Sequence, residues 1–333
     1  MSVEKLINDW KKSIFKPVYW LEGEESFYID KAMNYAEHHI LSVAEVDFNL
    51  TIFYGKDAQW AEVLNTCKRY PMFAERQIVL LKEAQHMKDI EKLQSYIEQP
   101  CLSTLFIISY KEKKIDGRSK FAKVLKQYGE VLTTKKLYDN QLPTWLSAHV
   151  RHKGFEITQK AVALLVEHIG NNLSRLNNEI DKILINISHP KKIDVDDVEQ
   201  YVGISKEFNI FELQHAIGKK DMNKTIRIIQ YFEANPKAAP IQMVLPNLYN
   251  FFSKVHMVLG SSTTDQSRLA KTLGVHEFFI RDYLYAAQQY TYKGIEKALL
   301  LLQDYNLRSL GINDAGTTDA ALLKELALKI LIN

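Results

Sequence analysis

The first 135 or so residues alternate short apolar runs with helical segments. Strand-like runs occupy residues 17–22, 47–54, 77–81, 105–110 and 130–133. Helical periodicity is found between them, over residues 26–40, 58–67, 89–98 and 121–127. Strands that alternate with helices of about a dozen residues are typical of a parallel sheet covered by helices. We therefore predict an α/β domain over residues 1–138.

From about residue 138 the pattern becomes helical. Short amphipathic helices are expected over residues 142–152, 158–169, 173–187 and 195–202, with no convincing strand among them. Further helices are expected over residues 211–217, 222–233, 240–259, 276–287, 292–309 and 322–331. Glycine, proline and asparagine are sparse there, which suits a helix bundle. We predict a small helical lid domain over 139–208 and a helical collar domain, used for oligomerisation, over 209–333.

The composition excludes several classes of protein. Forty-three basic and 40 acidic residues leave a net charge of +3, so no global field demands nucleic acid. Cys67 and Cys101 have no partner at metal-ligand spacing, which argues against a disulfide framework or zinc site and fits a reducing cytosol. The start of the chain does not resemble a signal peptide, and no stretch approaches membrane-spanning length. The sequence predicts a soluble, cytoplasmic protein with no membrane contact.

Groups of ionisable residues do not form a convincing catalytic or metal site. No Ser-His-Asp or Cys-His arrangement is apparent, and the histidines lack Cys or acid partners. The acidic run from Asp194 to Glu199 is better explained as a capped helix start than as a metal site. We predict no catalytic residue, no metal and no cofactor. The histidines in question are His38, His39, His149 and His152.

The turn after the first strand is where a phosphate-binding loop would lie. A Walker A loop needs glycines to wrap phosphate, then Lys and Ser/Thr. Residues 21–27 instead contain one glycine, Gly23, no lysine and three glutamates. Carboxylates there would repel a triphosphate, whereas Glu24 and Glu25 suit the positive end of a helix. Nucleotide binding at this turn is not expected.

The other two nucleotide elements are also altered. The apolar strand 78–81 is followed by Lys82, where an ATPase would place a Mg²⁺-binding aspartate. The strand at 105–110, where a polar sensor would stand, continues into Lys111-Glu112-Lys113-Lys114. Three altered elements on one correctly ordered scaffold predict an ATPase skeleton without its chemistry.

Five segments resemble the delta subunit of the bacterial DNA polymerase III clamp loader, an AAA+-related family that has lost ATPase chemistry. They are residues 19–25 (YWLEGEE), 72–80 (MFAERQIVL), 117–123 (GRSKFAK), 170–182 (GNNLSRLNNEIDK) and 208–213 (FNIFEL). The resemblance spans residues from about 17 to 330. It implies an AAA+-like domain followed by two all-α domains, and no intrinsic catalysis.

The resemblance also implies partners. Delta binds the ring-shaped sliding clamp (beta) and helps open it for loading onto primed DNA. It joins the delta-prime and tau/gamma subunits through the collar, in a hetero-pentameric ring around primer–template DNA. ATP is hydrolysed by its neighbours, and polymerisation belongs to the holoenzyme. Alternatives are an active AAA+ ATPase and a DNA-binding scaffold without clamp contact.

By the same resemblance, the clamp contact is Met72-Phe73, flanked by Tyr70 and Pro71. The family commonly has Leu-Phe there, and the flexible thioether of Met72 should preserve the fit. Burying an exposed Phe in a partner pocket contributes on the order of 1.5–3 kcal/mol. The alternative is that this pair caps the core of its own domain.

Basic residues near the end of the α/β domain are candidates for DNA contact. We favour a solvated face, because Glu112 and Asp116 dilute the charge. The candidates are Lys111, Lys113, Lys114 and Arg118, continuing to Lys120, Lys123 and Lys126. The same applies to Lys219, Lys220, Lys224 and Arg227. For Arg175, near the position of a phosphate-sensing arginine, a surface pair with Glu179 is expected instead.

Overall fold

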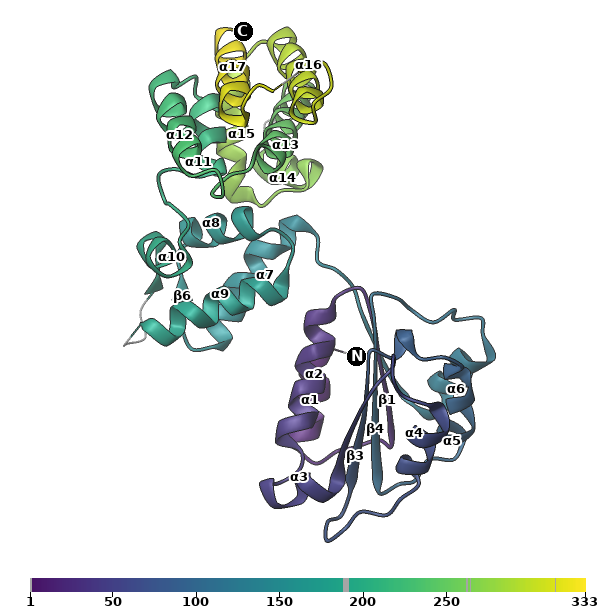
Figure 1. Ribbon diagram of the computed structural model, residues 1–333. Coiled ribbons are helices and arrows are strands. Elements are labelled where there is room, and N and C mark those ends of the chain that lie inside the picture. The colour runs from purple at the N-terminus through teal and green to yellow at the C-terminus, as the bar shows by residue number, and fades with distance from the viewer. Residues whose placement is uncertain (1, 188–191, 262, 264, 315) are drawn as a thin grey trace. The chain divides into compact units, whose positions relative to one another are not determined.

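The computed structural model describes residues 2–187, 192–261, 263, 265–314 and 316–333. The chain divides into two compact units, Met1–Leu137 and Tyr138–Asn333. Figure 1 shows the elements of each unit. None of the helices in the described ranges is long and apolar enough to cross a membrane.

A five-stranded sheet forms the centre of the first unit. Its strands are β1 Val18–Gly23, β2 Leu50–Tyr54, β3 Gln77–Lys82, β4 Thr104–Lys111 and β5 Glu130–Thr134. Their order is β2-β3-β4-β1-β5, and every neighbouring pair is parallel. β1 is buried throughout, and β3 and β4 nearly so, because a parallel sheet is covered on both faces. The predicted parallel α/β domain is confirmed.

Helices cover the two faces of this sheet (Figure 1). They are α1 Val3–Lys11, α2 Ser26–His39, α3 Val43–Asn49, α4 Trp60–Cys67, α5 Gln94–Glu98 and α6 Lys120–Tyr128, with 3-10 turns η1 Ala84–His86 and η2 Ile90–Leu93. α1 and α2 pack with Leu21 and Ile107 on one face. α4, α5 and α6 pack with Trp20 and Phe106 on the other. Alternate residues of one strand therefore belong to two cores.

Two expectations for this unit need correction. The strand predicted over 47–54 begins only at Leu50, because the preceding residues form α3. The cause is a capping box: the Glu45 carboxylate accepts hydrogen bonds from the backbone N–H and hydroxyl of Ser42, at 2.9 and 2.7 Å. The helix predicted over 89–98 is a 3-10 turn followed by one short α-helix.

The second unit begins with a group of short helices. They are η3 Asp139–Gln141, α7 Leu142–His152, α8 Gln159–Ile169, α9 Leu173–Asn186 and α10 Val195–Val202. The expectation of no strand here is wrong, since β6 Glu156–Ile157 and β7 Lys192–Ile193 form a two-residue parallel pair. Ile157 and Ile193 are both buried, so this pair closes the small core between the helices. Two residues are too few for a strand pattern to be visible in the sequence.

The rest of the second unit is a helix bundle. Its elements are α11 Ile210–Gly218, α12 Met222–Ala234, α13 Ile241–Leu259, α14 Gln266–Leu273, η4 Glu277–Phe279, α15 Ile280–Gln289, α16 Tyr292–Ser309 and α17 Asp319–Ile332. One apolar core joins α11, α12, α13, α16 and α17. α14 lies where no helix was predicted, and the helix expected from residue 276 begins as the 3-10 turn η4. The division of this unit at residues 208 and 209 stays a prediction.

Candidate partner-binding site

The loop between α4 and β3 displays apolar side chains to solvent. Phe73 is 97% exposed, Tyr70 82% and Met72 53%, whereas Pro71 is half-buried. The alternative that the pair caps its own core therefore does not hold for Phe73. The loop lies at the amino end of β3, the edge of the sheet opposite to the turn after β1. An exposed aromatic on a rigid unit is a typical interface anchor.

Asn49, the last residue of α3, holds the backbone of this loop. Its side chain is only 2% exposed. Its Oδ1 accepts a hydrogen bond from Met72 N at 2.7 Å, and its Nδ2 donates to Met72 O at 2.9 Å. The same Nδ2 also donates to Glu45 O at 3.0 Å. Both backbone groups of Met72 are thus fixed while its side chain stays outside.

Gln77 holds the two ends of the loop together. Its Nε2 donates to Arg69 O at 2.5 Å and to Thr104 Oγ1 at 2.8 Å. Arg76 lies with its guanidinium 4.3 Å from the centre of the Phe15 ring. The backbone at Arg69 and the side chain of Arg76, on the two sides of the apolar pair, are therefore held against the unit.

Phe73 has a left-handed backbone, with φ of +54°. For a residue other than glycine this conformation costs about 1–2 kcal/mol. Each of the two hydrogen bonds between Asn49 and Met72 contributes roughly 1 kcal/mol net, so together they are of the size needed to offset that strain. A strained, exposed aromatic that directly follows a residue fixed by a buried amide motivates a functional hypothesis.

At the opposite edge of the sheet, two consecutive backbone N–H groups of the turn after β1 are occupied. Gly23 N donates to Lys113 O at 3.1 Å, and Glu24 N lies 3.4 Å from Thr134 O. Gly23 has φ of +129°, and a Cβ there would lie 2.1 Å from Thr134 O. The Glu22 carboxylate accepts from Trp20 Nε1 and from the backbone N–H of Ile115. The turn is closed by its own neighbours, in contrast to a loop with free N–H groups.

Charged side chains near this turn also bond to groups of their own unit. Lys82 Nζ lies 2.6 Å from Glu37 Oε2. Glu25 caps α2 by accepting from Phe27 N, and burial raises the pKa of its carboxyl. Within the described ranges, His, Cys, Asp and Glu form no group of three that could hold a metal ion.

The predicted basic cluster is divided between paired and exposed residues. Lys111 Nζ lies 2.6 Å from Asp30 Oδ1, and Arg118 binds both carboxylate oxygens of Asp116 at 3.1 Å. Lys113 and Lys114 are exposed. In the second unit the basic residues are likewise engaged: Lys220 lies over the ring of Tyr290, Lys219 over Tyr285, Arg227 over Phe208, and Lys224 pairs with Glu212.

Two smaller expectations had different outcomes. Arg175 does not pair with Glu179 in the described part of the chain; Glu179 instead pairs with Lys182 at 2.5 Å. The acidic run does form a helix start, since Asp194 accepts from the backbone N–H of Asp197, whose carboxylate accepts from Asp194 N.

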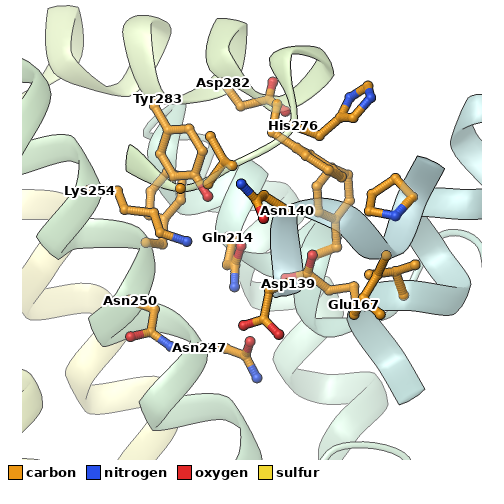
Figure 2. A pocket seen from close by; sticks show the side chains of 18 of the residues that line it. Asp139, Asn140, Glu167, Gln214, Asn247, Asn250, Lys254, His276, Asp282 and Tyr283 are labelled. Atoms are coloured by element: carbon orange, nitrogen blue, oxygen red, sulfur yellow. The ribbon is translucent and has the colours of Figure 1, made fainter. Parts of the chain in front are cut away.

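The second unit contains a cavity of about 270 Å³, shown in Figure 2. Glu167 of α8 and Lys254 of α13 both line it, and burial raises the pKa of Glu167 and lowers that of Lys254. His215 Nδ1 lies 3.2 Å from Asp282 Oδ1 at the same cavity. Acidic and basic side chains from several helices thus line one cavity. Sequence reasoning missed it, because its residues are far apart in the chain and follow no motif.

Asn49 was also missed, although a signal existed. The residues Ser42 to Glu45 match the capping-box pattern, which predicts a helix start and would have placed Asn49 at the end of a helix. Nothing in the sequence indicates that its side chain reaches Met72, 23 residues later.

The fold and this site together define a class of protein: a parallel α/β unit with a closed turn after its first strand, followed by a mainly helical unit. Two family models match, "DNA polymerase III, delta subunit" over residues 19–135 and "DNA polymerase III delta subunit, C-terminal domain" over residues 207–324. The chain belongs to the family of DNA polymerase III delta subunits, components of clamp loaders.

Individual relatives agree with this assignment. DNA polymerase III subunit delta of Bacillus subtilis is 24% identical, covering 97% of this chain and 94% of the relative. The probable delta subunit of Aquifex aeolicus is 22% identical, covering 68% of each. The solved structure of the Bacillus subtilis DNA clamp loader delta protein is similar with a TM-score of 0.59, covering 99% of this chain and 100% of that one at 22% identity. This last likeness concerns the fold.

Proposed function

We propose that this chain binds the sliding clamp through the apolar pair Met72-Phe73, with Tyr70 and Pro71 beside it, and helps hold the clamp open for loading onto primed DNA. The observation that carries the proposal is the exposure of Phe73 on a loop whose backbone is fixed. A fixed loop loses little conformational entropy on binding, so most of the burial energy remains available. Burying Phe73 would contribute on the order of 1.5–3 kcal/mol.

Several further features of the function are proposed with it. The chain hydrolyses no ATP, which the closed turn at Gly23 and the lysine at position 82 support. It assembles with the delta-prime and tau/gamma subunits in a hetero-pentameric ring through residues 209–333. Any DNA-directed polymerase activity belongs to the holoenzyme, and the work takes place in the cytoplasm, where the DNA is replicated.

The test is clamp binding by the isolated chain, with wild type beside Met72→Ala/Phe73→Ala. We expect the dissociation constant to rise about 10- to 100-fold, since each 1.4 kcal/mol is a factor of ten. The thermal midpoint should stay unchanged, because Phe73 and Met72 contribute little to their own core. Ile185→Ala removes another largely exposed apolar side chain, from α9, and should leave binding intact.

Phe73→Asp separates clamp binding from the alternative of a DNA-binding scaffold. Under the clamp proposal this variant loses the clamp and keeps whatever affinity the chain has for primer–template DNA. If clamp capture is unaffected while DNA binding drops, the clamp proposal is wrong. For the DNA contact, Lys113 and Lys114 are the exposed candidates, whereas Lys111 and Arg118 are paired with carboxylates.

A further inference from the structure

α3 is a short helix, and Asn49 is its buried residue. Its start is set by the capping box of Ser42 and Glu45, and its end leads directly into β2. The backbone of Asn49 is thereby fixed at the amino edge of the sheet. A side chain that leaves such a position has few rotamers open to it.

The amide of Asn49 is used on both its oxygen and its nitrogen. The oxygen accepts from Met72 N, and the nitrogen donates to Met72 O and to Glu45 O. An asparagine amide offers two N–H donors and one carbonyl acceptor, so both donors are occupied. Toward Met72 it acts as the neighbouring backbone of a strand would, because it pairs with an N–H and a C=O of the same residue.

This pairing differs from the other contacts of the loop. Gln77 binds Arg69 O and Thr66 O, before the apolar pair begins. Arg76 packs on Phe15 after the pair ends. Asn49 binds the backbone of Met72 itself, the residue that precedes the left-handed Phe73. The direction in which Phe73 leaves the surface is therefore set at Met72.

We propose that Asn49 is the positioning residue of the clamp-binding loop. It makes no contact with the clamp and acts by holding Met72, so that Phe73 keeps its left-handed backbone and its side chain projects into solvent. The inference rests on the proposed function, since it concerns how the same pair is presented. It assigns a role to a residue of α3 that lies 23 positions from the loop in the sequence.

The experiment is a double-mutant cycle on clamp affinity, with wild type, Asn49→Ala, Phe73→Ala and the double variant. We expect Asn49→Ala to weaken binding about tenfold, the worth of roughly one to two lost hydrogen bonds. The double variant should bind no more than about twofold more weakly than Phe73→Ala, because Asn49 acts through Phe73. If the two losses multiply, the positioning role is wrong.

Asn209→Ala is the matched control. Asn209 is also buried, and its side chain makes two hydrogen bonds to backbone, with Ser205 O and Glu212 N. Its loss should lower the thermal midpoint of the second unit and leave clamp affinity unchanged. If Asn209→Ala weakens clamp binding as much as Asn49→Ala does, the effect is general destabilisation and the inference fails.

Two further measurements cover the case in which Asn49→Ala does not fold. Asn49→Asp keeps the acceptor for Met72 N but loses both donated bonds, and should bind more weakly than wild type. In the wild-type protein, amide exchange of Met72 should be slow despite its exposed side chain, whereas exchange at the rate of an unstructured peptide would overturn the proposal.

The failure of this inference can be told apart from the failure of the proposed function. If Phe73→Ala leaves clamp binding unchanged, the proposed function fails. If only Asn49→Ala leaves clamp binding unchanged, this inference alone fails.

Discussion

Left-handed residues other than glycine turn the chain at both ends of β3. Phe73 precedes the strand and Glu83 follows it, and both have φ near +54°. Phe73 is presented to solvent, whereas Glu83 donates its N–H to Ser109 Oγ at 3.0 Å. The same backbone conformation thus leaves a side chain in solvent at the amino edge of the sheet and places a bonded N–H at its carboxyl edge. At the carboxyl edge the side chain of Lys82 is also engaged within the unit, because it pairs with Glu37.

A prediction at the residue scale concerns ATP. The isolated chain is expected to show no ATP turnover, and Lys82→Asp is expected not to create any. The added carboxylate could ligate Mg²⁺, but the backbone N–H groups of Gly23 and Glu24 remain bonded to Lys113 and Thr134. Phosphate release and nucleotide binding by both proteins would test this. Turnover above background by the wild-type chain would revive the reading as an active ATPase.

At the scale of elements, caps and ion pairs help to hold particular helices in position. α3 begins at the Ser42–Glu45 capping box. α16 and α17 are joined at one end by a network in which Arg308 Nη1 lies 3.1 Å and Lys329 Nζ 2.8 Å from the two oxygens of Glu325. In α16 and α17 these contacts add to the apolar core that joins the two helices. They also make the helix pair sensitive to acid.

Glu325 gives the prediction for this helix pair. The neighbouring polar and cationic groups, first of all the Lys329 ammonium and also the Arg308 guanidinium, lower the pKa of its carboxyl from 4.5 to about 2. Because the pKa of Glu325 is lower in the folded state than in the unfolded chain, its carboxylate stabilises the fold at pH values above the unfolded pKa. This stabilisation is lost as pH falls from about 4.5 toward 2. Glu325→Gln should therefore show a smaller loss of thermal stability over that range than wild type.

Glu296→Gln, an exposed change on α16, is the control and should follow the wild-type pH profile. Because Glu325 is partly exposed and screened by solvent, the difference should be small and should shrink in high salt. Parallel profiles for wild type and Glu325→Gln would contradict the assigned role.

At the scale of the whole molecule, each unit has its own apolar core. Two clusters on the faces of the sheet lie within Met1–Leu137, and the bundle cluster lies within Tyr138–Asn333. A unit of 137 residues is long enough to bury a stable core. The proposed clamp-binding residues all lie in the first unit.

Residues 1–137, expressed alone, are therefore expected to unfold cooperatively and to bind the clamp with Phe73-dependent affinity. Tryptophan fluorescence would follow unfolding, since Trp10 and Trp20 are buried there. Residues 138–333 should fold but not bind the clamp. A folded first fragment that fails to bind, beside a full chain that binds, would place part of the clamp contact in the second unit.

Much of this fold could be predicted from the sequence. Parallel strands bury both faces, so residues 77–81 and 105–110 are continuous apolar runs that are visible without a structure. α7 and α10 have the predicted bounds because Pro143 and Asp194 mark their starts. The pair β6 and β7 escaped prediction, because two residues carry no periodicity.

The candidate site was predictable only in part. The resemblance to the delta family indicated Met72 and Phe73, but an apolar pair before a strand is equally compatible with a buried position. Burial depends on what the rest of the chain brings near, and the structure leaves Phe73 uncovered. The basic residues show the same limit, since Asp30, which pairs with Lys111, lies 81 positions earlier in the chain.

The sequence alone determined most of the helices and strands and placed Lys82 at the end of β3, because periodicity, caps and residue identity are local properties. Tertiary structure decided how the apolar pair is held. Asn49 meets Met72 only after β2 and β3 have paired in parallel, which brings the end of α3 beside the loop that leads into β3. A hydrogen bond depends on distances of about 3 Å, and over 23 residues only the folded chain sets that distance.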